Sequence, residues 1–299
     1  MPDETNMRHK TALRTLICTL ILGTTCLASG PAMADDETPN TFSEETWASY
    51  ESQLPITDNV SAAAIAQDLS REMKSSVKRY RSPTEKTREA TQTMTQNILQ
   101  SHNVTISRPE TVLVVDRNPR IQTLTVMMAM PNNEPWIEIG QVPVSTGQQG
   151  RKNHYITPVG IFMNEPSRLG YRALGTYNEN HIRGIGLKGM RVWDFGWQEA
   201  EKGWKGNGSS GSIRLEMHAT DPANLESRLG RTNSAGCIRI PTDFDRFLDH
   251  TGLIDGSYEI EAQTDQRFAS LLPKNRHPYP TASNLTIVVD SAEKDNRQS

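Results

Sequence analysis

The hydrophobic pattern of the chain changes its period near residue 110, and this change constrains the fold more than any other feature. Upstream, apolar residues recur every fourth position, which predicts a single apolar stripe on a helix. These residues are Ile65, Leu69, Met73 and Val77, followed by Ala90, Met94 and Ile98. Downstream, β-branched runs such as 111–116 (TVLVVD) are separated by Gly- and Pro-rich turns, which is typical of strands.

We therefore expect a mostly β domain over 110–264, preceded by a helical accessory region over 35–109. A helix start is expected at Ser82–Glu85, with Ser82 as N-cap and Pro83 in the first turn. Another helix is expected over 242–250, closed by Gly252. The segments that predict strands are 111–116, 121–128, 136–139, 142–145, 157–163, 212–218, 237–240 and 257–260.

Two further segments show no clear period. The stretch 164–211 is rich in Gly, Trp and Arg, and we expect a long loop over the sheet there. Its residues Trp193, Trp197 and Trp204 would either line a substrate-covering flap or pack the loop onto the sheet. The segment 265–299 contains several prolines and ends in a polar run, which predicts a C-terminal surface tail.

The N-terminal residues 1–34 have the features of a secretory signal peptide. Arg8, Lys10 and Arg14 form a positive region, an apolar stretch follows over 16–27, and Ala32-Met33-Ala34 matches a cleavage site. The apolar stretch is too short to span a bilayer comfortably, and no later segment is long and apolar enough to do so. We therefore expect an exported protein of the periplasm or cell wall, without a transmembrane segment in the mature chain.

The net charge and the cysteines narrow the function further. A formal net charge of -3 offers no global basic field, so nucleic acid is not an expected partner. Of three cysteines, Cys18 and Cys26 would leave with the signal, so an internal disulfide is excluded in the mature chain. The remaining Cys237 is then either a small buried apolar residue or a reactive thiol.

The residues around Cys237 are compatible with nucleophilic catalysis. A thiol becomes a nucleophile when a nearby imidazole accepts its proton, and His218 at the end of a predicted strand is the candidate base. Cys237 follows the small-residue turn Ser234, Ala235 and Gly236, and the backbone N–H groups of Gly236 and Cys237 would form an oxyanion hole. From spacing alone this signal is weak, and a buried structural Cys stays open. One Cys and one His make up half of a usual metal-ligand set, so we expect no metal and no other cofactor.

Arg239 stands two residues beyond Cys237. On a strand this spacing puts both side chains on the same face, where Arg239 would bind a substrate carboxylate through its guanidinium.

The segment from His218 to Arg239 resembles the active-site signature of the YkuD-type L,D-transpeptidases. In that family a His is followed, after a comparable gap, by Ser/Thr-His-Gly-Cys and then by Arg or Asn. Here 15 residues separate His218 from Ser234, and Gly236, Cys237 and Arg239 match. Two upstream tracts, 144–147 (VSTG) and 157–160 (TPVG), also resemble the family and occur in its order. The resemblance covers 110–264.

This resemblance implies a YkuD-like mixed β-sandwich catalytic domain that acts on peptidoglycan stem peptides. Cys237 would form a thioester with the donor stem, His218 would be the base, and an amine of the acceptor stem would resolve the thioester. The family's usual His before Gly is Ala235 here, so the resemblance does not specify which linkage forms. Three alternatives stay open: hydrolysis of stem peptides as a carboxypeptidase or endopeptidase, attachment of a protein to the wall, and a non-catalytic wall-binding module. The sequence does not determine the oligomeric state.

Overall fold

The computed structural model describes residues 39–82 and 84–292, all of which belong to one structural unit, Glu37–Ser299. The predicted signal segment, with Cys18 and Cys26, lies outside the described residues, and so does Pro83. Within the described ranges, no helix combines the length and the apolar character needed to cross a membrane.

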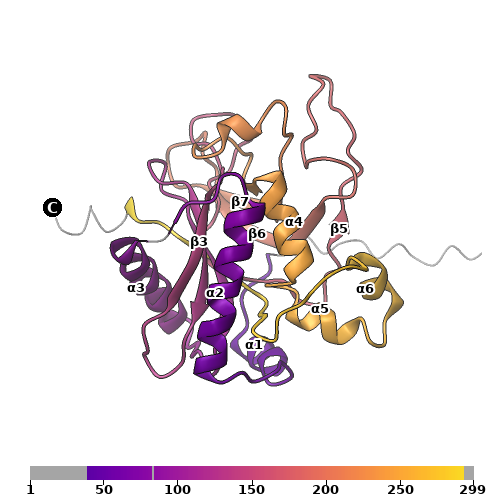
Figure 1. Ribbon diagram of the computed structural model, residues 1–299. Helices are drawn as coiled ribbons and strands as arrows, with labels where there is room; N and C mark the ends of the chain where they lie inside the picture. The colour runs from indigo at the N-terminus through magenta and orange to yellow at the C-terminus, as the bar shows by residue number, and fades with distance from the viewer. Residues whose placement is uncertain (1–38, 83, 293–299) are drawn as a thin grey trace, which may run out of the picture. The chain divides into compact units, whose positions relative to one another are not determined.

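The described residues form two sheets and six α-helices (Figure 1). The helices are α1 (Glu44–Glu51), α2 (Asn59–Ser76), α3 (Glu85–Ser101), α4 (Thr242–Thr251), α5 (Gly256–Glu261) and α6 (Gln266–Leu271), with a 3-10 turn at Glu226–Arg228. The strands are β1 (Glu110–Asp116), β2 (Thr123–Ala129), β3 (Ile137–Pro143), β4 (Gly160–Met163), β5 (Tyr171–Arg172), β6 (Arg191–Glu201), β7 (Ser210–Ala219), β8 (Ile238–Ile240) and β9 (Leu285–Val289). Helix and strand occur in about equal amounts over the described residues, so the fold as a whole is mixed α/β, and the strands gathered in 110–264 are consistent with the predicted β-rich domain.

The first sheet has five strands in the order β3-β2-β1-β9-β4. Every residue of β1, β2 and β9 is buried, because one sheet face packs on helices and the other on the second sheet. β9 runs parallel to β1 and antiparallel to β4. The prediction of a surface tail beyond 264 was therefore wrong: the end of the chain supplies an interior strand.

The second sheet has four strands in the order β5-β6-β7-β8. Its longest strand, β6, lies inside the stretch that the sequence predicted to be a loop, and that prediction was wrong. Buried residues of both sheets, among them Leu113 and Val115 of β1 with Trp193 of β6 and Leu215 of β7, share one hydrophobic core. The tract 212–218 and the segment beginning at Cys237 form β7 and β8, close to their predicted bounds.

The N-terminal helices pack onto the first sheet, α2 against β3 and α3 against β9 and β4 (Figure 1). The predicted stripe is confirmed on α2, where Leu69 and Met73 are fully buried. α3 begins at Glu85, two residues later than expected, because its N-cap is Thr84 and not Ser82, and Thr84 forms a capping box with Thr87.

The helices after β8 confirm one prediction and contradict another. α4 ends at Gly252, which adopts a left-handed φ of 63° as a C-cap. The predicted strand 257–260 is instead part of α5, whose first residues are buried.

Candidate active site

The residues predicted to be catalytic lie on adjacent strands of the second sheet. β7 and β8 pair in parallel, and His218 stands opposite Arg239 in their register. Cys237 immediately precedes β8. Side chains alternate between the faces of a strand. The core-facing pair Met217 and Ile238 therefore leaves His218, Arg239 and Cys237 together on the opposite face.

The turn before Cys237 is held by a serine hydroxyl. Ser234 Oγ accepts a hydrogen bond from the Gly236 N–H at 3.1 Å and donates one to the Cys237 carbonyl at 2.6 Å. Gly236 has a φ of 143°, and a Cβ there would lie 2.9 Å from Ile213 Cδ1, so this position requires glycine. The Gly236 N–H, an expected oxyanion-hole donor, is thus engaged within the turn.

A separate segment clamps both sides of this turn. Ser145 and Arg239 exchange backbone hydrogen bonds of 3.0 and 2.9 Å. The Thr146 carbonyl accepts from the Ser234 N–H, and the Ser234 carbonyl accepts from the Gln148 N–H, each at 3.0 Å. The tract 144–147 therefore extends the sheet past β8 and fixes the backbone on both sides of Cys237.

Thr157 joins the second upstream tract to the same turn. Its hydroxyl donates to the Gly236 carbonyl at 2.5 Å and accepts from the Gly147 N–H at 2.9 Å. A Cβ on Gly147 would lie 1.9 Å from the Tyr155 carbonyl oxygen, so no other residue fits there. Two tracts that lie about 80 to 90 residues before Cys237 in the sequence thus meet at the nucleophile candidate.

The imidazole of His218 is oriented by its own backbone. Its Nδ1 lies 2.6 Å from the carbonyl oxygen of Ala219, which can only accept, so Nδ1 carries the proton and Nε2 keeps its lone pair. The side chain is 3% exposed. Burial lowers the pKa of His218 to about 4, and the charge of Arg239 adds to this. His218 is therefore neutral at pH 7 and can accept a proton at Nε2.

The thiol of Cys237 is protonated in the free protein. Burial raises the pKa of Cys237 to about 12, and the nearby Glu216 carboxylate contributes to the rise. The Sγ contacts the Arg214 carbonyl oxygen at 3.8 Å, and within the described residues no hydrogen bond joins it to His218. The site thus rests as a neutral thiol beside a neutral imidazole, and catalytic contacts of this kind often tighten only when substrate binds.

Acidic residues flank the thiol on the β6 side, and the sequence had not singled them out. Glu216 accepts a hydrogen bond from the Tyr171 hydroxyl at 2.9 Å, and burial raises the pKa of Glu216. Asp194, opposite Glu216 in the register, is paired with Arg214 at 2.6 Å. The alternation of β7 already puts Glu216 on the face of His218, so this neighbour was predictable, whereas Tyr171 and Asp194 depend on strand pairing.

Basic residues lie on the β8 side. Arg239 Nη1 donates to the Asn233 carbonyl at 2.9 Å, and its Nε has no partner among the described residues. Burial lowers the pKa of Arg239, and the charges of Arg151 and Arg228 act in the same direction. A carboxylate bound here would relieve this repulsion, which is compatible with the predicted substrate-binding role of Arg239.

The tryptophans of the supposed loop pack inside or against the domain. Trp193 is fully buried in the shared core. Trp204 packs edge-on against Tyr155 with ring centroids 5.1 Å apart, and the Tyr155 N–H donates to the Ala235 carbonyl at 3.0 Å. Both rings therefore support the domain and the turn.

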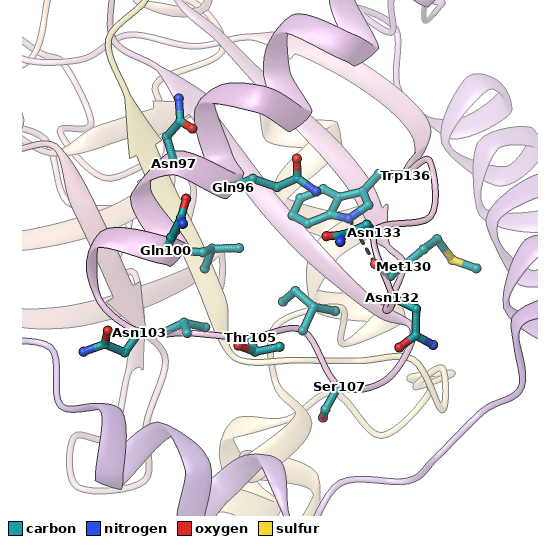
Figure 2. Close-up of a pocket in the computed structure, with 13 residues that line it drawn as sticks. Gln96, Asn97, Gln100, Asn103, Thr105, Ser107, Met130, Asn132, Asn133 and Trp136 are labelled. Atoms are coloured by element: carbon teal, nitrogen blue, oxygen red, sulfur yellow. Dashed lines mark hydrogen bonds between the residues drawn. The ribbon is translucent and has the colours of Figure 1, made fainter.

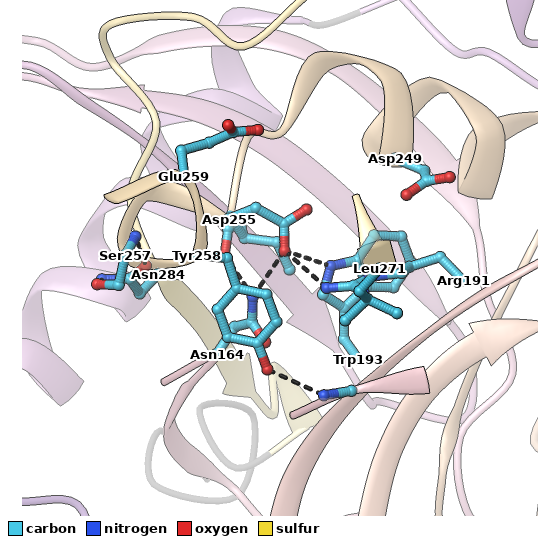
Figure 3. Close-up of polar contacts among 12 residues, drawn as sticks. Asn164, Arg191, Trp193, Asp249, Asp255, Ser257, Tyr258, Glu259, Leu271 and Asn284 are labelled. Atoms are coloured by element: carbon cyan, nitrogen blue, oxygen red, sulfur yellow. Dashed lines mark hydrogen bonds and ion pairs between the residues drawn. The ribbon is translucent and has the colours of Figure 1, made fainter. Parts of the chain in front are cut away.

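Figure 3 shows a polar cluster that includes Arg191 and Trp193 of β6 together with Asp255. The side chains of Arg191, Trp193 and Asn164 all donate to one oxygen of Asp255, at 3.1, 3.2 and 2.7 Å. Arg191 and Asp255 are fully buried, so this cluster anchors β6 to the start of α5 and does not face a substrate. Within 39–82 and 84–292, no group of three or more His, Cys, Asp or Glu side chains is arranged to hold a metal ion.

The chain matches no protein-family model and no curated protein. Among solved structures it is similar to Bd1075 of Bdellovibrio bacteriovorus, with 16% identity, a TM-score of 0.27, and coverage of 64% of this chain and 53% of that one. It is also similar to a fused Zn-dependent amidase/peptidase/peptidoglycan-binding domain-containing protein of Clostridium acetobutylicum, with 16% identity, a TM-score of 0.23, and coverage of 56% and 64%. The chain spans less than two thirds of the length of each structure.

Proposed function

We propose that this chain is an exported L,D-transpeptidase that cross-links peptidoglycan stem peptides through a Cys237 thioester. One observation carries the proposal: the turn before Cys237 is held by both upstream tracts that resemble the YkuD family, on the same sheet face as His218. A buried cysteine with a purely structural role would not require a glycine turn, a clamped backbone and an oriented imidazole around it.

The proposed reaction begins from the neutral thiol of Cys237 and the neutral imidazole of His218. His218 Nε2 takes the thiol proton while Sγ attacks a donor-stem carbonyl, and His218 then gives that proton to the departing amine of the terminal residue. A thioester to Cys237 remains. An acceptor-stem amine attacks it and loses a proton to His218, and the protonated imidazole returns that proton to the sulfur as the thiol leaves. The new amide bond replaces the one that was broken, so the exchange needs no redox partner.

Cys237 is half-buried, and a site that restricts the access of water to its thioester would favour transfer to an amine over hydrolysis. The flanking charges suggest how the two stems are oriented. Arg239 would bind a donor carboxylate, while Glu216 on the other side would attract the cationic form of an acceptor amine.

Product analysis tests this proposal. Purified mature protein is incubated with disaccharide-tetrapeptide muropeptides, with the Cys237→Ala variant alongside, and the products are identified by mass spectrometry. We expect cross-linked dimers from the wild type alone. Shortened monomers without dimers would show that the protein is a hydrolase and not a transpeptidase. Unchanged substrate in both samples would favour a wall-binding module.

A further inference from the structure

A groove on the first sheet's side of the molecule has the chemistry of a carbohydrate site. It encloses about 940 Å³, within the range of roughly 300–1,000 Å³ that is usual for small-molecule sites. None of the described residues that line it is charged, although 22% of the chain is charged. Six of them are amides: Gln96, Asn97, Gln100, Asn103, Asn132 and Asn133.

The walls of the groove come from two elements (Figure 2). The end of α3 and the turn after it supply four of the amides, and the β2–β3 hairpin supplies Asn132 and Asn133. None of these six side chains forms a hydrogen bond to another described residue, and all but Gln96 are exposed. An amide offers both donors and an acceptor, so the walls present solvent-facing groups of both kinds that are free to bind a ligand.

Hydroxyl side chains line the floor of the groove. Over residues 104–107, Val104 and Ile106 are buried beneath it, whereas Thr105 and Ser107 are exposed. Trp136 closes one end, with its indole N–H already satisfied by the Met130 carbonyl at 3.2 Å. A groove lined by uncharged amide and hydroxyl groups matches the hydroxyl and acetamido groups of a sugar.

The two walls are held at a fixed separation. Gln92 of α3 accepts a hydrogen bond from the Trp136 N–H at 3.1 Å, and Asn59 of α2 donates to the Glu134 carboxylate at 2.8 Å. The hairpin is therefore tied to two helices. A groove that exists before its ligand arrives loses less entropy on binding.

We propose that this groove binds an uncharged, hydroxyl- and acetamido-bearing oligosaccharide. That this ligand is the glycan strand of peptidoglycan rests on the proposed function. The groove ends at Trp136, just before β3, and the clamp on Cys237 lies at Ser145, just beyond the other end of that strand, about 30 Å away at roughly 3.3 Å per residue. The glycan strand would thus be held apart from the stem peptides that reach the thiol.

The probe for this site is the N-acetylglucosamine tetramer, titrated calorimetrically into the full mature chain carrying Cys237→Ala. We expect binding that is insensitive to salt, because the lining carries no charge. The Asn97→Ala/Gln100→Ala variant should bind about tenfold more weakly, since two hydrogen bonds are lost. Asn275→Ala, which removes an exposed amide elsewhere, should bind like the parent.

Three outcomes would overturn the proposal: no binding to the parent, equal binding to the double variant, or binding of an uncharged tetrapeptide in place of the sugar. The assay needs no turnover, so it is independent of the transpeptidase proposal. The Asn97→Ala/Gln100→Ala variant is also made in a chain that retains Cys237. It should keep its activity on stem peptides that carry no sugar. This second assay distinguishes an error in the groove proposal from an error in the assignment of the catalytic residues.

Discussion

At the scale of single residues, the reactivity of Cys237 depends on the charge of its neighbour Glu216. Glu216→Gln removes a negative charge that raises the pKa of the thiol, so alkylation by iodoacetamide at mildly alkaline pH should become faster. A decrease of half a pKa unit would give an increase of about threefold. The pH dependence of the alkylation rate measures this, and Glu89→Gln on the exposed side of α3 is the control. An unchanged rate would show that Glu216 does not act on the thiol.

His218 should make the fold sensitive to acid. Its pKa falls from 6.5 to about 4 on folding, so between these values the unfolded chain binds a proton that the folded chain excludes. Above pH 6.5 this imidazole is neutral in both states and does not lower the free energy of unfolding. As the pH falls toward 4, the free energy of unfolding decreases by up to about 3 kcal/mol. The free energy of unfolding of His218→Asn should decrease less over the same interval, because this variant has no imidazole to protonate at this position. Urea unfolding of both proteins across this interval measures the difference, and parallel curves would contradict the burial of a neutral imidazole.

At the scale of elements, Thr157 connects the 157–160 tract to the Cys237 turn. Thr157→Val removes its hydroxyl and leaves the Gly147 N–H and the Gly236 carbonyl without this partner, at a cost of about 2 kcal/mol. Because the turn loses its anchor, turnover should fall on the order of tenfold. Thr157→Ser keeps the hydroxyl, so its stability and its turnover should both be close to those of the wild type. If the valine variant equals the wild type in turnover, the clamp does not position the thiol.

The elements that the sequence predicted correctly are those with strong local patterns. The run 111–116 became β1, and the helix before Gly252 became α4, because β-branched residues and a glycine C-cap act within a few residues. β6 was missed because a register irregularity between Asp194 and Trp197, with Gly196 at a φ of 76°, interrupts its alternation. β9 carries a β-branched run of its own (LTIVV), and it was missed because the prolines that precede it, Pro273, Pro278 and Pro280, indicated a surface tail.

The candidate site also contains some residues that the sequence predicted and others that it did not. Cys237, His218 and Arg239 follow from one contiguous motif and from strand alternation, so their common face was predictable. The Ala219 carbonyl that orients His218 and the hydroxyl of Tyr171 were not, because both depend on geometry that local spacing does not encode.

At the scale of the whole molecule, the fold needs its C-terminal segment. A chain truncated after Gln263 lacks β9, which lies between β1 and β4 in the first sheet, so we expect it to lose cooperative unfolding altogether. A chain that ends at Ala292 retains every described strand and serves as the control. Circular dichroism during thermal unfolding distinguishes them. A cooperative transition in the shorter chain would mean that the domain ends near residue 264 after all.

The central claim is that Cys237 forms a thioester with a stem peptide, and intact-protein mass spectrometry tests it most directly. The mature protein is mixed with a tetrapeptide stem without an acceptor amine, quenched in acid and weighed. The account predicts a mass increase equal to the stem without its terminal residue, located on Cys237 by proteolysis and absent from Cys237→Ala. An unmodified wild-type protein across a range of donor stems, or an equal adduct on Cys237→Ala, would contradict it.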